Sequence, residues 1–199
     1  RRHLDQFVRT HQQQTIVAQI LNDVRREVSD PSLSLDGVIA QLLRWIDQDK
    51  KITPLKALQG LIWEQGYRDG SFHGHIYADA LAQLRAWHDQ GLQLAVYSSG
   101  SVQAQKLLFA HTEAGDLTPL FSHYFDTHIG AKIHSNAYTQ IAKTMGLPGN
   151  EILFLSDIQA ELDAAKQAGL NTCWLVRDAT PDAHAKHPQV TQFGDICLV

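Results

Sequence analysis

Hydrophobic side chains recur at three- and four-residue steps through the first third of the chain, which is the spacing of amphipathic helices. The first stripe of hydrophobic residues contains Leu4, Phe7, Val8, Ile16, Val17, Ile20, Leu21, Val24 and Val28. The second contains Leu35, Val38, Ile39, Leu42, Leu43 and Ile46. Asp30-Pro31 separates the stripes, because the residue before proline avoids helical backbone angles. A third segment runs from Pro54, which suits the first turn of a helix, to Gly66. This region predicts a small helical bundle without a strand.

The pattern changes after a glycine-rich stretch at 66–75. Short apolar runs that predict strands now alternate with helical patterns. The runs are LQLAVYSS at 92–99, HYFDTHIG at 123–130, ILFLS at 152–156 and NTCWLV at 171–176, and the helices are expected at about 78–89, 102–111, 135–145 and 160–168. Such alternation is typical of a parallel sheet covered on both faces. We therefore predict a helical region at 1–72 and an α/β region at 73–199, whose sheet is Rossmann-like.

Composition and charge narrow the classes of protein that fit this pattern. The 199 residues are 44% hydrophobic and 19% charged, which is ordinary for a globular protein. A net charge of -4 argues against non-specific binding to nucleic acid. No run is long and apolar enough to span a bilayer, and no signal-peptide pattern is present, so we expect a cytoplasmic protein without membrane contact. Cys173 and Cys197 lack metal-ligand spacing and are expected to be buried, reduced thiols.

Polar residues follow three of the apolar runs and could form one anion-binding site. Ser98 and Ser99 end the first run, Asp157 follows ILFLS, and Lys132 lies just after HYFDTHIG. Open parallel sheets bind ligands at the carboxyl ends of their strands, where these residues would meet. A carboxylate ~4 Å from a phosphate dianion, at an effective dielectric of ~20, meets a repulsion of roughly 8 kcal/mol, so cations are needed. Lys132 and a Mg²⁺ ion held by Asp157 could supply them, and the two hydroxyls could bind phosphate oxygens.

Each of these positions also has an ordinary structural explanation. A Ser-Ser-Gly stretch can be a turn, with Ser101 capping the next helix, and Lys132 can be a surface lysine. Asp157 can cap the helix that follows it. Glu161 is interpreted as a solvated helix residue rather than a second acid of the site. The order of Ser98, Ser99, Lys132 and Asp157 along one α/β chain favours the functional interpretation.

Several other residues are not assigned to the site. The histidine pairs His73/His75 and His184/His187 lack the further ligands that a metal requires, so we expect them in loops or at the surface. Packing in the core is expected for three aromatic residues: Trp63, Tyr97 and Tyr138.

The order of these motifs resembles that of the haloacid-dehalogenase-like phosphatases, through Ser98-Ser99, Lys132 and LFLSDIQAELDAA at 153–165. More narrowly, the chain is similar to the enolase-phosphatases of methionine salvage, also called acireductone synthases. That similarity rests on LQGLIWEQGYRDGSFHGHIYAD at 58–79, VYSSGSVQAQKLLF at 96–109 and YFDTHIGAKIHSNAYTQIA at 124–142. It implies a sheet core with a helical cap formed by residues 1–72.

The resemblance also implies an activity, a cofactor and a partner. In such enzymes a 2,3-diketo-5-methylthiopentyl 1-phosphate is enolised and then hydrolysed to acireductone and phosphate. The residues that match Ser98, Ser99 and Lys132 bind this small phosphate ester, and the one that matches Asp157 helps to hold Mg²⁺. A monomer is implied as well.

One family motif has no match in this chain. The first strand, which ends in Asp-x-Glu-Gly-Thr and carries the nucleophile, is absent, so no catalytic nucleophile is present. We expect this chain to be part of a longer protein, and to be inactive and poorly folded as it stands, because a central strand would be missing. Two alternatives stay open: another phosphatase of the same superfamily, and a non-catalytic homologue that has lost its nucleophile.

Overall fold

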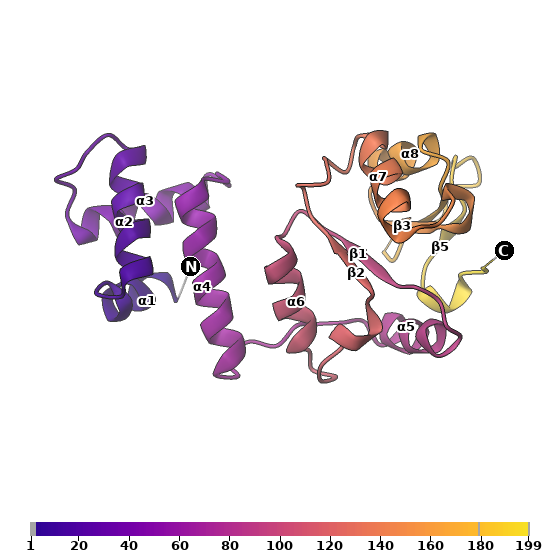
Figure 1. Cartoon of the computed structure of the whole chain (residues 1–199), viewed down its shortest axis with the longest axis horizontal. Helices are drawn as coiled ribbons and strands as arrows, with labels where there is room; N and C mark the ends of the chain where they lie inside the picture. Colours follow the sequence, from indigo (N-terminus) through magenta and orange to yellow (C-terminus); the bar gives the residue numbers. More distant parts are fainter. Residues whose placement is uncertain (1–2, 179, 199) are drawn as a thin grey trace. The chain divides into compact units, whose positions relative to one another are not determined.

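The computed structural model describes residues 3–178 and 180–198. The chain divides into two compact units, one reaching to Phe72 and the other beginning at His73. Figure 1 shows the first unit as helices in indigo and purple, and the second as helices and strands in magenta to yellow. Within the described residues, no helix is both long and apolar enough to cross a membrane. The roles of the two units as cap and phosphatase core stay predictions.

The first unit is helical, as its pattern predicts. Its helices are α1 (Leu4–His11), α2 (Thr15–Glu27), α3 (Leu35–Asp47) and α4 (Thr53–Arg68). The first hydrophobic stripe is divided between α1 and α2, and Ser34 caps α3 by accepting a hydrogen bond of 3.1 Å from the Gly37 amide. Pro54 occupies the first turn of α4.

The apolar stripes of these helices pack into one core. Its buried members are Leu4, Phe7, Val8, Val17, Ile20, Leu21, Val24, Val38, Ile39, Leu42, Trp45, Leu55, Leu58 and Ile62. The prediction that Trp63 packs in the core is wrong, because 48% of its surface is exposed. Trp63 follows Ile62 directly, and Ile62 occupies the inward-facing position on α4. The helical rotation between the two residues carries the indole out of the core.

The second unit alternates helices with strands. Its elements are α5 (Ala78–Asp89), β1 (Ala95–Tyr97), α6 (Val102–Ala110), β2 (His123–Phe125), α7 (Ser135–Met145), β3 (Leu153–Ser156), α8 (Gln159–Gln167), β4 (Asn171–Leu175) and β5 (Gln189–Val190), with the 3₁₀ turns η1 (Thr118–Leu120), η2 (Gly149–Glu151) and η3 (Phe193–Asp195). The four predicted helices agree with α5, α6, α7 and α8 to within about one residue at each end. The predicted strands are longer than the observed ones.

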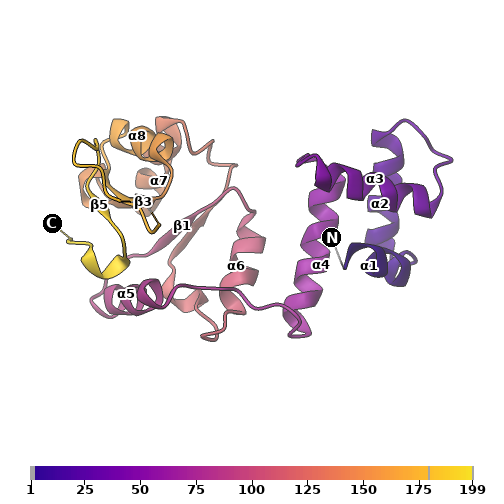
Figure 2. The same cartoon turned by 180° about the vertical axis from the view of Figure 1, so that it is seen from behind.

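All strand pairs are parallel, as predicted, but the strands form two separate pieces. β1 pairs with β2, and β3 pairs with β4, which pairs with β5. Among the described residues, β1 and β3 each have a strand on one side only. Figure 2 shows the two pieces from behind, with β1 apart from β3. The absence of the family's first strand stays a prediction.

Alternating side chains of β3 enter two different clusters. Phe154 packs with Tyr138 of α7 and Ala164 and Ala165 of α8, whereas Leu153 and Leu155 pack with Trp87 of α5, Cys173 and Ile196. Successive residues of a strand point to opposite faces, so β3 is covered on both sides as the pattern predicts. Cys173 is buried as expected, but the expectation is wrong for Cys197, which is exposed because it follows the last buried apolar residue, Ile196.

Candidate active site

The loop at 98–101 joins β1 to the first turn of α6. The Ser98 hydroxyl accepts a hydrogen bond of 3.1 Å from the Gly100 amide, which closes a tight turn. The Ser101 hydroxyl accepts one of 3.2 Å from the Ala104 amide, so the predicted cap is confirmed. Ser99 is exposed, and its hydroxyl has no hydrogen bond within the described parts of the chain. Ser99 is therefore the residue of this loop whose hydroxyl is available to a ligand.

Lys132 lies in an ion pair rather than free in solvent. Its ammonium donates a hydrogen bond of 3.2 Å to Oε2 of Glu161, and its side chain is only 25% exposed. The same ammonium lies 5.6 Å from the ring centre of Tyr97. The surface-lysine alternative is thus wrong, and so is the interpretation of Glu161 as a solvated helix residue. A half-buried cation beside a carboxylate suits a charged ligand.

Two tyrosine hydroxyls hold the loop that carries Lys132. Tyr97 donates a hydrogen bond of 2.8 Å to the Gly130 carbonyl, and Tyr138 donates one of 2.7 Å to the carbonyl of Lys132 itself. Gly130 has a φ of 137°, and a Cβ there would lie 2.9 Å from the Cβ of Ala137, so only glycine fits. Burial, and then the nearby Glu161 carboxylate, raise the pKa of both tyrosines, which keeps both hydroxyls protonated as donors.

Tyr97 and Tyr138 were expected only to pack in the core, and their hydrogen-bonding role is not visible in the sequence. Both do pack: their rings meet edge to face with centres 5.6 Å apart. The hydroxyls reach carbonyls that are 33 and six residues away along the chain. For Tyr97, its place in an otherwise apolar run indicated that the buried hydroxyl needs a hydrogen-bond partner, but the sequence did not indicate which partner.

Asp157 follows β3 directly, and its side chain is exposed. Its backbone carbonyl accepts a hydrogen bond of 3.1 Å from the Trp174 indole, while its carboxylate has no partner among the described residues. The helix-cap alternative for Asp157 is wrong, because Ile158 occupies the N-cap position of α8 and no side chain caps this helix. The Ser156 hydroxyl accepts a hydrogen bond of 3.0 Å from the Ile158 amide and donates one of 2.9 Å to Glu161.

A cavity of about 460 Å³ joins several of these residues. Its polar lining includes Lys132, Ser156, Asp157 and Glu161, and most of the remaining lining is apolar side chains of β1, β3 and the helices beside them. Tyr97 also lines this cavity, but Ser98 and Ser99, which follow it, do not. The structure thus brings Lys132 and Asp157 to one cavity and leaves the serine pair next to it along the chain.

The acidic residues of this cavity fit a magnesium ion in part. Residues 3–178 and 180–198 contain no group of three or more histidine, cysteine, aspartate or glutamate side chains that could hold a metal. Mg²⁺ commonly uses only one or two carboxylates and takes its other ligands from water and substrate phosphate. The unpaired carboxylate of Asp157, at a cavity that also contains Lys132, suits this mode of binding.

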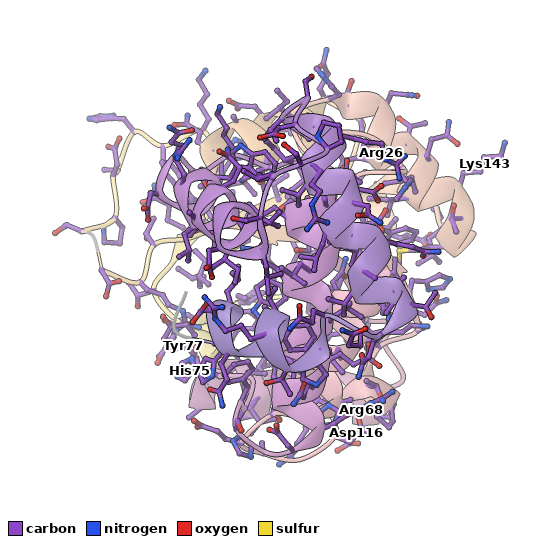
Figure 3. The ribbon with its side chains drawn as sticks, turned by 90° about the vertical axis from the view of Figure 1, so that its left-hand side faces the viewer. Arg26, Arg68, His75, Tyr77, Asp116 and Lys143 are labelled. Atoms are coloured by element: carbon purple, nitrogen blue, oxygen red, sulfur yellow. The ribbon has the colours of Figure 1, made fainter. Side chains whose placement is uncertain are left out.

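The histidine pairs behave differently from each other. His73 and His75 are exposed, as expected, and His75 packs edge-on against Tyr77 with ring centres 5.0 Å apart (Figure 3). His187 lies in the loop before β5, as expected, but it is buried, with only 2% of its surface exposed. Its ring nitrogens lie 2.8 Å from the Thr172 hydroxyl and 3.0 Å from a carboxylate oxygen of Asp163. His187 therefore links β4 and α8 and lies outside the cavity described above.

Comparison with known proteins gives concordant results. A family model described as haloacid dehalogenase-like hydrolase matches residues 8–169. Enolase-phosphatase E1 of Methylococcus capsulatus is 57% identical over 98% of this chain and 86% of its own length. The protein of the same name from Serratia proteamaculans is 52% identical over 100% of this chain and 86% of its own length. The crystal structure of UTR4 protein from Saccharomyces cerevisiae has a TM-score of 0.81 and 29% identity, and covers 98% of this chain and 87% of the yeast chain.

Proposed function

The chain belongs to the haloacid dehalogenase-like hydrolases, and on that basis we propose that it is the Mg²⁺-dependent enolase-phosphatase of methionine salvage. Its substrate would be 2,3-diketo-5-methylthiopentyl 1-phosphate, and its products acireductone (1,2-dihydroxy-3-keto-5-methylthiopentene) and phosphate. The observation that carries the proposal is the 57% identity to an enolase-phosphatase over 98% of this chain. The cavity that holds Lys132 and Asp157 supports it, because a phosphate ester needs a cation and an oxygen-ligand site together.

Ser99 and Lys132 are proposed to bind the phosphate group of the substrate. The Lys132 ammonium would form charge-assisted hydrogen bonds to phosphate oxygens, and its loop is held in place by the two tyrosine hydroxyls. The exposed Ser99 hydroxyl would donate a further hydrogen bond, and Ser98 shapes the turn that presents it. Binding of a dianion beside Glu161 costs repulsion, which the charge of Lys132 offsets.

Asp157 is proposed as a ligand of Mg²⁺. When bound, the ion would neutralise phosphate charge and stabilise an enolate. Glu161 would act on Lys132, whose ammonium it contacts at 3.2 Å, and through Ser156 it is connected to the end of the same strand. The nucleophile and the base for enolisation are not assigned to residues of this chain, and the prediction that the nucleophile belongs to the Asp-x-Glu-Gly-Thr motif stays a prediction.

The proposal is tested with protein expressed from its complete gene and the diketo phosphate ester as substrate. Acireductone formation is followed by ultraviolet absorbance and phosphate by a colorimetric assay, with simple phosphate esters for comparison. Equal release of the two products, specific for the diketo ester, is expected. Phosphate release from many esters without acireductone would favour another phosphatase of the superfamily, and no release at all would favour a non-catalytic homologue.

The magnesium assignment has its own test. Chelation with EDTA should abolish turnover, and added Mg²⁺ should restore it. Asp157→Asn should raise the Mg²⁺ concentration needed for half-maximal activity, because a neutral amide is a weaker ligand for a hard cation than a carboxylate. An unchanged Mg²⁺ requirement in this variant would remove Asp157 from the metal site. Analytical ultracentrifugation of the same preparation checks the proposed monomer.

A further inference from the structure

The loop at 98–101 is also held by a glutamine of α6 that the proposed function does not use. Gln105 is only 6% exposed. Its amide nitrogen donates hydrogen bonds of 2.8 Å to the Gly100 carbonyl and of 2.8 Å to the Phe125 carbonyl. The first acceptor lies within the loop, and the second is the last residue of β2. Gln105 therefore ties the loop to the end of the neighbouring strand.

An amide is the side-chain group that suits this position. Both acceptors are carbonyl oxygens, so the group between them must supply two hydrogens, which a glutamine NH₂ does. A carboxylate would place negative oxygens against both carbonyls, and an aliphatic side chain would leave the Gly100 carbonyl without this partner. The Phe125 carbonyl also accepts a hydrogen bond of 3.1 Å from the Ser98 amide. One carbonyl of β2 thus receives hydrogen bonds from the loop and from α6.

Asp126, the residue that follows β2, holds the other end of the loop. One of its carboxylate oxygens accepts a hydrogen bond of 3.1 Å from the amide of Val102, the first residue of α6. The other accepts one of 2.9 Å from the His128 amide and lies 2.7 Å from the His128 ring. Burial raises the pKa of this carboxyl, but the hydrogen bonds from His128 and Val102 outweigh burial and lower the pKa below its usual range. Asp126 is therefore ionised at neutral pH.

Apart from the bond of the Ser98 amide to Phe125, the loop's own hydrogen bonds do not fix its orientation toward the sheet. The bonds from Gly100 to Ser98 and from Ala104 to Ser101 are local, and they would move with the loop. Gln105 and Asp126 connect both ends of the loop to the end of β2. A bound phosphate requires its donors to be held within about 0.5 Å of the productive geometry, which local turns do not guarantee.

We propose that Gln105 and Asp126 are positioning residues that orient the Ser98–Ser101 loop for phosphate binding. This inference rests on the proposed function, because it assumes that the loop binds the phosphate group of the substrate. Both side chains act through the loop: the amide of Gln105 and the carboxylate of Asp126 are engaged with backbone groups. A shift of the loop by about 1 Å can cost about a hundredfold in rate, so their loss should be visible in kinetics.

The test uses Gln105→Leu and Asp126→Asn in protein expressed from its complete gene, with Gln103→Leu as the matched control. Gln103 lies in the same helix two residues earlier and is exposed. The Gln105 amide oxygen is buried without a partner among the described residues, so leucine also removes an unsatisfied acceptor and the variant should fold. Both variants should raise KM and the inhibition constant of inorganic phosphate at least tenfold, with a smaller change in kcat. Gln103→Leu should leave both constants unchanged.

Isothermal titration calorimetry measures the binding of inorganic phosphate alone. Together with turnover of the diketo ester, it tests the positioning role separately from the proposed function. If the unmodified protein turns over the diketo ester but the two variants bind phosphate as it does, the positioning role is wrong and the proposed function stands. If phosphate binding weakens in both variants but the diketo ester is not a substrate, the positioning role stands and the proposed function is wrong. A lower melting temperature with unchanged KM and phosphate affinity would assign both residues a purely structural role and overturn the inference.

Discussion

The core of the helical unit is more completely buried than strands β1 and β3 of the sheet unit. In the helical unit, Val8, Val17, Val24, Leu42 and Leu58 are all 0% exposed. In the sheet unit, by contrast, every residue of β3 is only partly buried, and no residue of β1 is fully buried. A helix satisfies its backbone hydrogen bonds within itself, whereas a strand needs a neighbour on each side. β1 and β3 are therefore less completely buried than the helical core, although α7 and α8 of the sheet unit contribute the fully buried Tyr138 and Leu162.

The proposed site lies beside these two partly buried strands. The cavity that contains Lys132 and Asp157 is lined by apolar residues of β1 and of β3, which belong to separate pieces of sheet. The polar residues of the site are held by hydrogen bonds such as those of Tyr97, Tyr138 and Ser156, rather than by a continuous sheet. The residues that form the helical core are thus different from the residues that are proposed to perform the chemistry.

The largest expected effect is a loss of catalytic activity with little loss of stability. Lys132→Ala should lower kcat/KM by about a hundred- to a thousandfold, because it removes the cation that is proposed to bind the phosphate. The melting temperature should fall modestly, because Glu161, whose side chain is 13% exposed, loses the ammonium but keeps the hydrogen bond from Ser156. Lys143→Ala is the matched control, because Lys143 is an exposed residue of α7 that projects into solvent (Figure 3). A near-normal rate in Lys132→Ala would exclude the proposed site.

Truncating a leucine in each unit tests the difference in burial directly. Leu42→Ala, in the helical core, should lower the free energy of unfolding of that unit by about 2–5 kcal/mol. Leu155→Ala, in β3, should cost less, about 1–2 kcal/mol, because its side chain is already partly exposed and lines a cavity. Urea unfolding followed by circular dichroism measures both. Equal losses would mean that β3 is as well packed in solution as the helical core.

Hydrogen exchange tests the same contrast without a mutation. Backbone amides of β1 and β3 should exchange about a hundredfold faster than those in the middle of α2 and α4, because fewer neighbours cover them. Mass spectrometry of peptides from the two units measures the rates. Equal protection of β3 and α4 would contradict the comparison.

The smallest expected effect concerns an ion pair within the sheet unit. Arg177 donates two hydrogen bonds of 3.0 Å to Asp79, which also accepts one of 2.9 Å from the Phe193 amide. The hydrogen bonds from Arg177, followed by those from backbone amides, lower the pKa of Asp79 despite burial. A depressed carboxyl pKa stabilises the fold above the unfolded-state pKa of about 3.9, and this stability is lost as pH falls through the lower folded-state value.

Asp79→Asn should therefore lower the free energy of unfolding of the sheet unit by about 1–3 kcal/mol at pH 7 and flatten its decline below about pH 4. Asp89→Asn, at the exposed far end of α5, is the control and should change little. Thermal unfolding between pH 2 and pH 7 measures both variants. An unchanged acid profile in Asp79→Asn would show that the pair with Arg177 does not contribute.

The sequence by itself determined the elements whose signals are local. The bounds of α5 and α7, the cap at Ser101 and the parallel direction of the strands follow from periodicity, capping chemistry and alternation within a few residues. These local features do not depend on distant partners. Motif order also predicted that Lys132 and Asp157 would meet, and both line one cavity, but Ser98 and Ser99, predicted at the same site, do not line it.

Only the tertiary structure decided which residues hold the site together. Glu161 pairs with Lys132 across 29 residues of sequence, Tyr97 reaches Gly130 across 33, and Gln105 reaches Phe125 across 20. The division of the sheet between β1 and β3 is likewise a property of the folded chain. Periodicity reports which face of an element is buried, but it carries no information about which side chain of another element lies opposite. That choice is made by packing and by the need of each buried polar group for a partner.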